Sequence, residues 1–181
     1  MKKAGKKDHG RKIATLALLA GLGLVSFLLE SLLPSAVLPG AKLGISNLFT
    51  LFALAVYGLP EALLVTVVRT VLGSLFAGNP SLLLYSLTAG VTAAAAARLL
   101  LFLPRVSLLA VSVAQAVVHN LVQLSVYCAL TQTLLLVSYA PWLCLFGVLA
   151  GALVGGAAIT TIRALPDPAL QRIGARTEEL I

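Results

Sequence analysis

The chain has 181 residues, of which 60% are hydrophobic and 10% are charged, and its mean hydropathy is +1.04. Soluble domains average about 45–50% apolar and about 25% charged residues, so this composition excludes an ordinary water-soluble fold. The formal net charge is +7, but the basic residues lie at the ends of apolar segments and form no single stripe, which argues against nucleic acid as a partner.

Apolar segments near the length of a membrane span follow one another along the chain. A bilayer core of about 30 Å needs about 20 apolar residues in a helix, and Pro, Gly and charged residues divide this sequence into six segments. We therefore predict an all-α integral membrane bundle of six transmembrane helices. The predicted spans are residues 13–33, 45–57, 60–77, 81–103, 107–130 and 141–165, between a basic leader (1–12) and a short tail (166–181).

Capping and helix-breaking residues set the predicted ends of the spans. Asn79 before Pro80 is typical of a helix start, because Asn caps the first turn and Pro is tolerated at the first helical position. Gly58 and Pro60 predict a tight turn between the second and third spans. Short loops therefore alternate with hydrophobic hairpins.

The positions of Lys and Arg predict the orientation in the membrane. Positive charges near helix ends are retained on the cytoplasmic side. With both termini inside, eleven of the thirteen basic residues lie on that side, Lys42 lies outside, and Arg69 lies within the membrane. We expect a multi-pass protein of the bacterial plasma membrane with cytoplasmic termini.

The second predicted span is unusually short and follows a loop rich in Gly and Pro, residues 38–47. A shortened span with irregular backbone is a place where a cavity and a helix terminus can meet a ligand. Lys42 would place positive charge at the outer mouth of such a cavity. The alternative is an ordinary connector whose Lys42 extends to the lipid headgroups.

Arg69 is the basic residue placed inside the membrane. An unpaired charge in hydrocarbon costs at least about 2.5–3.5 kcal/mol, so such residues face a partner or a cavity. Gly73, one helical turn away, would leave room above the guanidinium. Two alternatives stay open: Arg69 binds an anionic ligand, or it forms a structural ion pair with Glu30 of the first span.

The fifth span carries a stripe of hydrogen-bonding side chains. Ser112, Gln115, His119 and Gln123 fall within an arc of about 80°, and Asn120 lies at its margin. These groups are either interhelical contacts or one wall of a polar pocket. We favour the pocket, which makes Gln115, His119, Asn120 and Gln123 candidate ligand contacts.

Small residues at four-residue spacing predict close helix packing in two spans. Gly147, Gly151 and Gly155 form such a ridge in the last span, and Ala17 and Gly21 do so in the first. If the ridge of the first span is exposed, it would suit a membrane partner.

Sequence motifs for catalysis are missing. The chain has no nucleotide-binding loop, no HExxH motif and no acid-rich DDxxD motif, and its six acidic residues are scattered. Magnesium-diphosphate chemistry would therefore lack ligands. We expect no catalytic residues, no metal and no cofactor, and ATP-driven work would need another subunit.

Four motifs resemble a known family. They are LPGAKLGISN at 38–47, EALL at 61–64 followed by RTVLGSL at 69–75, SLTAG at 86–90 and QAVVHNLVQ at 115–123. Across nearly the whole chain the sequence resembles the bacterial Gx transporter family, also catalogued as heptaprenyl diphosphate synthase component I. It is also similar to the substrate-binding S components of energy-coupling factor (ECF) transporters.

The resemblance implies a six-helix subunit that captures a small molecule from outside and docks on a membrane scaffold subunit and two ATPases. It makes Lys42, Asn47, Arg69, His119, Asn120 and Gln123 pocket candidates. It makes Ala14, Ala17 and Gly21 a docking face. The substrate would be anionic or related to isoprenoid or quinone precursors. The alternative function is a non-catalytic membrane component of polyprenyl (heptaprenyl) diphosphate synthesis.

Overall fold

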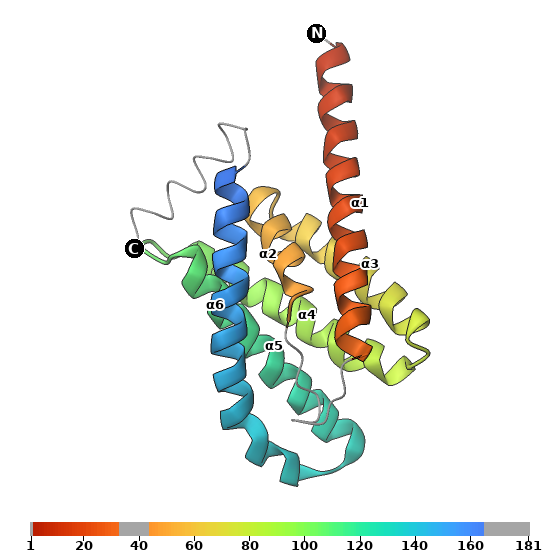
Figure 1. Ribbon diagram of the computed structural model, residues 1–181, viewed down its shortest axis with the longest axis vertical. Helices are drawn as coiled ribbons and strands as arrows, with labels where there is room; N and C mark the ends of the chain where they lie inside the picture. The colour runs from red at the N-terminus through yellow and green to blue at the C-terminus, as the bar shows by residue number, and fades with distance from the viewer. Residues whose placement is uncertain (1, 33–43, 165–181) are drawn as a thin grey trace.

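The computed structural model describes residues 2–32 and 44–164. It contains six α-helices and one 3₁₀ helix, and no strand within these ranges: α1 (Lys2–Leu32), α2 (Asn47–Val56), α3 (Leu59–Phe76), α4 (Pro80–Leu101), α5 (Leu108–Thr131), η1 (Leu134–Tyr139) and α6 (Ala140–Ala164) (Figure 1). Lys42 and the tail from 166 to 181 lie outside the described residues.

The predicted all-α bundle is confirmed. Five helices are long and apolar enough to span a membrane, which indicates a multi-pass membrane protein. The exception is α2, which has 10 residues and so a length of about 15 Å, roughly half of a bilayer core. The structure therefore shortens the second span, predicted over residues 45–57, to a half-length helix.

The half-length helix α2 lies inside the bundle, in contact with α1, α3, α4 and α6. Its Leu51 and Leu54 are fully buried and belong to the same apolar core as Val65 of α3, Val111 of α5 and Ile162 of α6. The chain reverses after α2 at Gly58, whose φ of 110° is unfavourable for residues with a side chain. This packing holds the first residue of α2 at an interior position.

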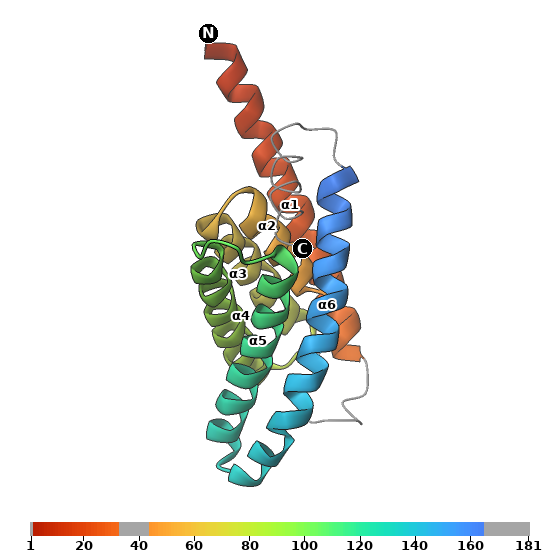
Figure 2. The same ribbon diagram turned by 90° about the vertical axis from the view of Figure 1, so that its left-hand side faces the viewer.

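Helix α1 begins at Lys2, so the predicted basic leader continues the first span as one helix. Figures 1 and 2 show that its first turns extend beyond the other helices, at the end of the molecule where α6 finishes. Lys12 of α1 forms an ion pair with Glu61 of α3, with 2.5 Å between Nζ and Oε1, and lies 5.8 Å from the Tyr57 ring centre. These contacts join α1 to the α2–α3 turn.

The glycine ridge of α6 packs against α5. A Cβ placed on Gly151 would lie 2.6 Å from the Val113 Cα and 2.9 Å from the Ser112 carbonyl oxygen, both of which are backbone atoms. Gly147 and Gly155 approach the same helix at similarly short distances. The ridge predicted from spacing is therefore an internal packing surface, because it lets two helix backbones approach closely.

We expect Gly151→Ala to destabilise the bundle, because neither the Val113 backbone nor the Ser112 carbonyl can move without shifting α5. Overpacking of this kind costs about 1–3 kcal/mol. Thermal unfolding in detergent should show a lower Tm for Gly151→Ala. Gly156→Ala is the matched control, because a Cβ there meets no atom within 4 Å; equal Tm values for the two variants would contradict the packing.

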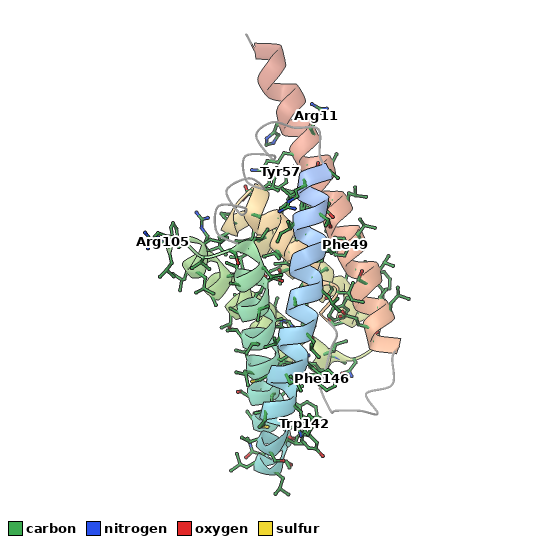
Figure 3. All side chains as sticks on the ribbon, turned by 60° about the vertical axis from the view of Figure 1, so that its left-hand side comes forward. Arg11, Phe49, Tyr57, Arg105, Trp142 and Phe146 are labelled. Atoms are coloured by element: carbon green, nitrogen blue, oxygen red, sulfur yellow. The ribbon has the colours of Figure 1, made fainter. Side chains whose placement is uncertain are left out.

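The α5–η1–α6 hairpin has an exposed apolar tip. Figures 1 and 2 show the tip at the opposite end of the molecule from the start of α1. Leu134 and Leu135 are 81% and 83% exposed, Trp142 is exposed, and no charged residue occurs from 107 to 162. Figure 3 shows Trp142 near this tip, far from Arg11. Apolar residues flanked by Tyr and Trp are typical of a membrane–water interface.

Trp142 is the sole tryptophan of the chain, so its fluorescence reports on the tip alone. In vesicles that contain lipids brominated on the acyl chains, we expect strong quenching of Trp142 and weak quenching by aqueous iodide. Strong iodide quenching with no effect of brominated lipid would place the tip in water and contradict its position in the interface.

Candidate ligand-binding site

Buried polar side chains from five helices or their flanking residues gather around the start of α2. Each is at most 6% exposed, although they lie in segments that are otherwise apolar. They are Glu30 of α1, Ser46 and Asn47 at the start of α2, Arg69 and Thr70 of α3, Ser86 of α4 and His119 of α5. Such groups inside a membrane protein face a partner or a cavity, because hydrocarbon offers them no hydrogen bonds.

Arg69 lies near the middle of α3 and is 2% exposed. Its Nη2 donates a hydrogen bond to Oδ1 of Asn47, at 2.9 Å, while its Nε has no hydrogen-bond partner among the described residues. The guanidinium therefore retains one unused donor. That makes it the strongest candidate in this part of the chain for contact with an anionic or acceptor group.

The space around Arg69 comes from Gly23 of α1. A Cβ on Gly23 of α1 would lie 3.1 Å from the Arg69 Cδ. At Gly73 the space is filled by Phe27, whose Cε1 would lie 2.7 Å from an added Cβ. The expectation that Gly73 makes room for the guanidinium was wrong, because the aromatic ring from α1 occupies that position.

Glu30 binds the N-terminal end of α2. Its Oε1 accepts hydrogen bonds from the N–H of Ile45 and, at 3.4 Å, from the N–H of Ser46, and its Oε2 accepts one from the Ser46 hydroxyl at 3.3 Å. A carboxylate is favoured there by the unpaired N–H groups and the positive end of the helix dipole. Glu30 and Arg69 therefore lie in one cluster and line the same hollow.

A small hollow lies between these groups. It is lined by residues of four helices and of the approach to α2: Phe27, Glu30, Gly44, Ser46, Arg69, Thr70, Ser86 and His119. A second hollow, beside Asn47, is lined by Gly44, Ser112, Gln115, Ala116, Ala150 and Val154. Each has room for about one water molecule. A larger ligand would require the surrounding segments to move.

Some polar residues of the α5 stripe bond to α6, and others line the two hollows. The Ser112 hydroxyl donates to the Gly151 carbonyl at 2.7 Å, and the Asn120 amide donates to the Leu143 carbonyl at 3.1 Å, so these two residues join α5 to α6. Gln115 and His119 line the two hollows. Gln123 is 1% exposed, and neither its amide nitrogen nor its amide oxygen has a hydrogen-bond partner in the described part of the chain.

Four members of the cluster were missed as site residues from sequence. Glu30 was considered only as a partner of Arg69, and Ser46, Thr70 and Ser86 were not chosen as contacts, because single hydroxyl groups are common in membrane helices. Ser86 had a usable signal: it lies about one turn from Gly90, where a Cβ would lie 2.7 Å from Thr66 of α3. Close approach of α3 and α4 turns this side of α4 inward.

The predicted docking face on α1 is exposed. Ala14, Ala17 and Gly21 are all exposed, and a Cβ on Gly21 would meet no atom within 4 Å. Leu16 and Leu19, on the other side of the helix, are buried in the core. The small-residue ridge of α1 is therefore turned away from the bundle, in contrast to the ridge of α6.

The chemistry available at the cluster is noncovalent. Its side chains supply a guanidinium, an imidazole, amides, hydroxyls and one carboxylate, in surroundings of low dielectric constant where hydrogen bonds are strong. In the described ranges, no three His, Cys, Asp or Glu side chains come together as metal ligands. The arrangement suits recognition of a polar group.

The fold and the site define a small all-α membrane protein with a buried polar cluster at the start of a half-length helix. The family model for heptaprenyl diphosphate synthase component I matches residues 19–161, and the chain belongs to that family. This match confirms the family resemblance of the sequence motifs. A search of the curated proteins and a search of the solved structures each found no match.

The contact between Arg69 and Asn47 predicts that substitutions at these two residues have non-additive effects on the free energy of unfolding. We expect Asn47→Leu to lower the free energy of unfolding by about 1–3 kcal/mol, because a buried guanidinium loses an acceptor. The double variant Asn47→Leu/Arg69→Met should lose less than the sum of the two single variants, because it leaves no buried charge. Additive losses, measured by thermal unfolding in detergent, would contradict the contact.

Proposed function

We propose that this chain is the substrate-binding membrane subunit of an uptake transporter, similar to an ECF S component. The observation that carries the proposal is Arg69, which is buried at the middle of α3, beside a small hollow, with one unused N–H donor among the described residues. A charge in this position is costly, and a polar ligand that enters from outside would offset that cost.

The ligand is a small molecule with an anionic or strongly accepting group. Arg69 would donate to such a group from Nε, which has no partner among the described residues, whereas the N–H groups of Ile45 and Ser46 are already bonded to Glu30. Among the sequence candidates, Asn47 positions the guanidinium, while His119 and Gln115 line the adjacent hollows. Asn120 stays a candidate contact, although its amide nitrogen donates to α6. Lys42, outside the described residues, also stays a candidate.

Transport would require partners. The exposed ridge of Ala14, Ala17 and Gly21 suits docking on a membrane scaffold subunit, because small residues allow close approach of a second helix. Two ATPases attached to the scaffold would supply energy. The protein would reside in the bacterial plasma membrane with both termini in the cytoplasm, as the distribution of basic residues predicts.

Depletion of a defined growth medium tests the proposal. Cells that express this chain with an ECF-type scaffold and its ATPases should remove at least one small molecule faster than cells without the chain. We expect Arg69→Ala and His119→Ala to reduce that difference at least about tenfold, because one lost charge-assisted hydrogen bond is worth about 1.5–3 kcal/mol.

Ser125→Ala is the matched control for this experiment, because its side chain is exposed on the other side of α5 and bonds the Leu121 carbonyl. All variants should reach the membrane in equal amounts. Undiminished depletion with both Arg69→Ala and His119→Ala would overturn the assignment of the binding site.

The name of the matching family favours a second candidate function. In that role the chain is a non-catalytic membrane component of heptaprenyl diphosphate synthesis. The six acidic residues are scattered along the sequence, so diphosphate-bound magnesium would be held by a partner synthase component. Chain elongation by that partner, assayed in vesicles with and without this chain, tests the role; equal rates would remove it.

A further inference from the structure

Gln123 of α5 is the starting observation. Its side chain is 1% exposed, and both its amide nitrogen and its amide oxygen lack a hydrogen-bond partner among the described residues. A buried amide that makes no hydrogen bond loses its hydration without compensation. Packing alone therefore gives no reason for a glutamine here.

The neighbouring polar residues of α5 show how a purely structural residue behaves in this helix. Ser112 and Asn120 each donate to a main-chain carbonyl of α6, at 2.7 and 3.1 Å. Gln123 makes no such contact, although α5 and α6 pack along much of their length. Its amide therefore does not hold these two helices together.

Gln123 lies next to the candidate site along α5, just beyond the residues that line the two hollows. It follows His119 by four residues, so the two side chains lie on the same face of α5, about 6 Å apart along the axis. His119 lines the hollow that also includes Arg69 and Glu30. A ligand held at Arg69 and extending along α5 by one helical turn would reach the Gln123 amide.

We infer that the ligand carries a paired hydrogen-bond donor and acceptor, as in a carboxamide or a lactam, and that Gln123 binds this pair. A glutamine amide offers one acceptor and two donors in a plane, and it forms two parallel hydrogen bonds with a group of the complementary pattern. The inference rests on the proposed function, because Arg69 would hold the anionic group of the same molecule. The ligand class is a small carboxylate with a carboxamide or lactam edge.

The thermal stability of the ligand-free protein tests whether the Gln123 amide is without hydrogen bonds when no ligand is bound. Gln123→Leu keeps the side-chain size and removes both unpaired groups, so the Tm should rise by about 2–6 °C in a chain of this length. Ser125→Leu, a polar-to-apolar change on the exposed side of the same helix, should leave the Tm nearly unchanged. A lower Tm for Gln123→Leu would show that the amide is already bonded and would overturn the inference.

Binding of matched probe pairs tests the ligand class. One pair is 4-carbamoylbutanoate and pentanoate, and the other is orotate and benzoate. Within each pair both members carry a carboxylate, and only the first carries a carboxamide or lactam. At equal millimolar concentrations, the first member of at least one pair should raise the Tm of the full chain in detergent. That rise should vanish in Gln123→Leu and persist in Ser125→Leu.

The outcomes separate this inference from the proposed function. Equal shifts with both members of each pair, lost only in Arg69→Ala, would overturn the role of Gln123 and leave the anion site intact. A Tm shift that persists in Gln123→Leu would also overturn the role of Gln123 and leave the anion site intact. The absence of a shift with every probe would overturn the ligand class, while medium depletion would still test uptake.

Discussion

The hydrogen bond from Arg69 to Asn47 is the contact on which the rest of the site depends. It joins a charged group near the middle of a membrane-spanning helix to the first residue of a helix that crosses half the bilayer. A full-length second span would place continuous helix where the start of α2 now lies, and its backbone N–H groups would be satisfied internally. Because α2 starts late, these N–H groups, Glu30 and the guanidinium meet in one place.

The remaining helices hold this arrangement in position. The α6 glycines bring the backbones of α5 and α6 close together, and Ser112 and Asn120 bond across the same contact. That fixes the rotation of α5 and turns His119 toward the hollow that contains Arg69. On the opposite side, Gly23 and Phe27 of α1 fit around Arg69 and Gly73 of α3. Rigid packing thus surrounds a cluster whose guanidinium keeps an unused N–H donor among the described residues.

The sequence was informative wherever one local rule decides the structure. Span length and hydropathy predicted the bundle, and Asn79 caps α4 through the N–H groups of Ser81 and Leu82, as expected from Asn before Pro. The positions of the charged and amide residues along the apolar segments predicted that Arg69 lies within the membrane and that the polar residues of α5 share one helix face. They could not assign partners, because the contacts of Asn47 with Arg69 and of Glu30 with Ser46 join helices that are distant in sequence. For the same reason, the sequence could not show that Ser112 and Asn120 bond to α6 while Gln115 and His119 line the hollows.

Native mass spectrometry of the protein released from its own membrane tests the central claim most directly, because it asks whether a small molecule occupies the cluster around Arg69. The account predicts a retained adduct of defined mass on the wild-type chain, and its loss from a folded Arg69→Met variant. A wild-type chain that carries lipid alone, or an adduct that persists unchanged in Arg69→Met, would contradict it.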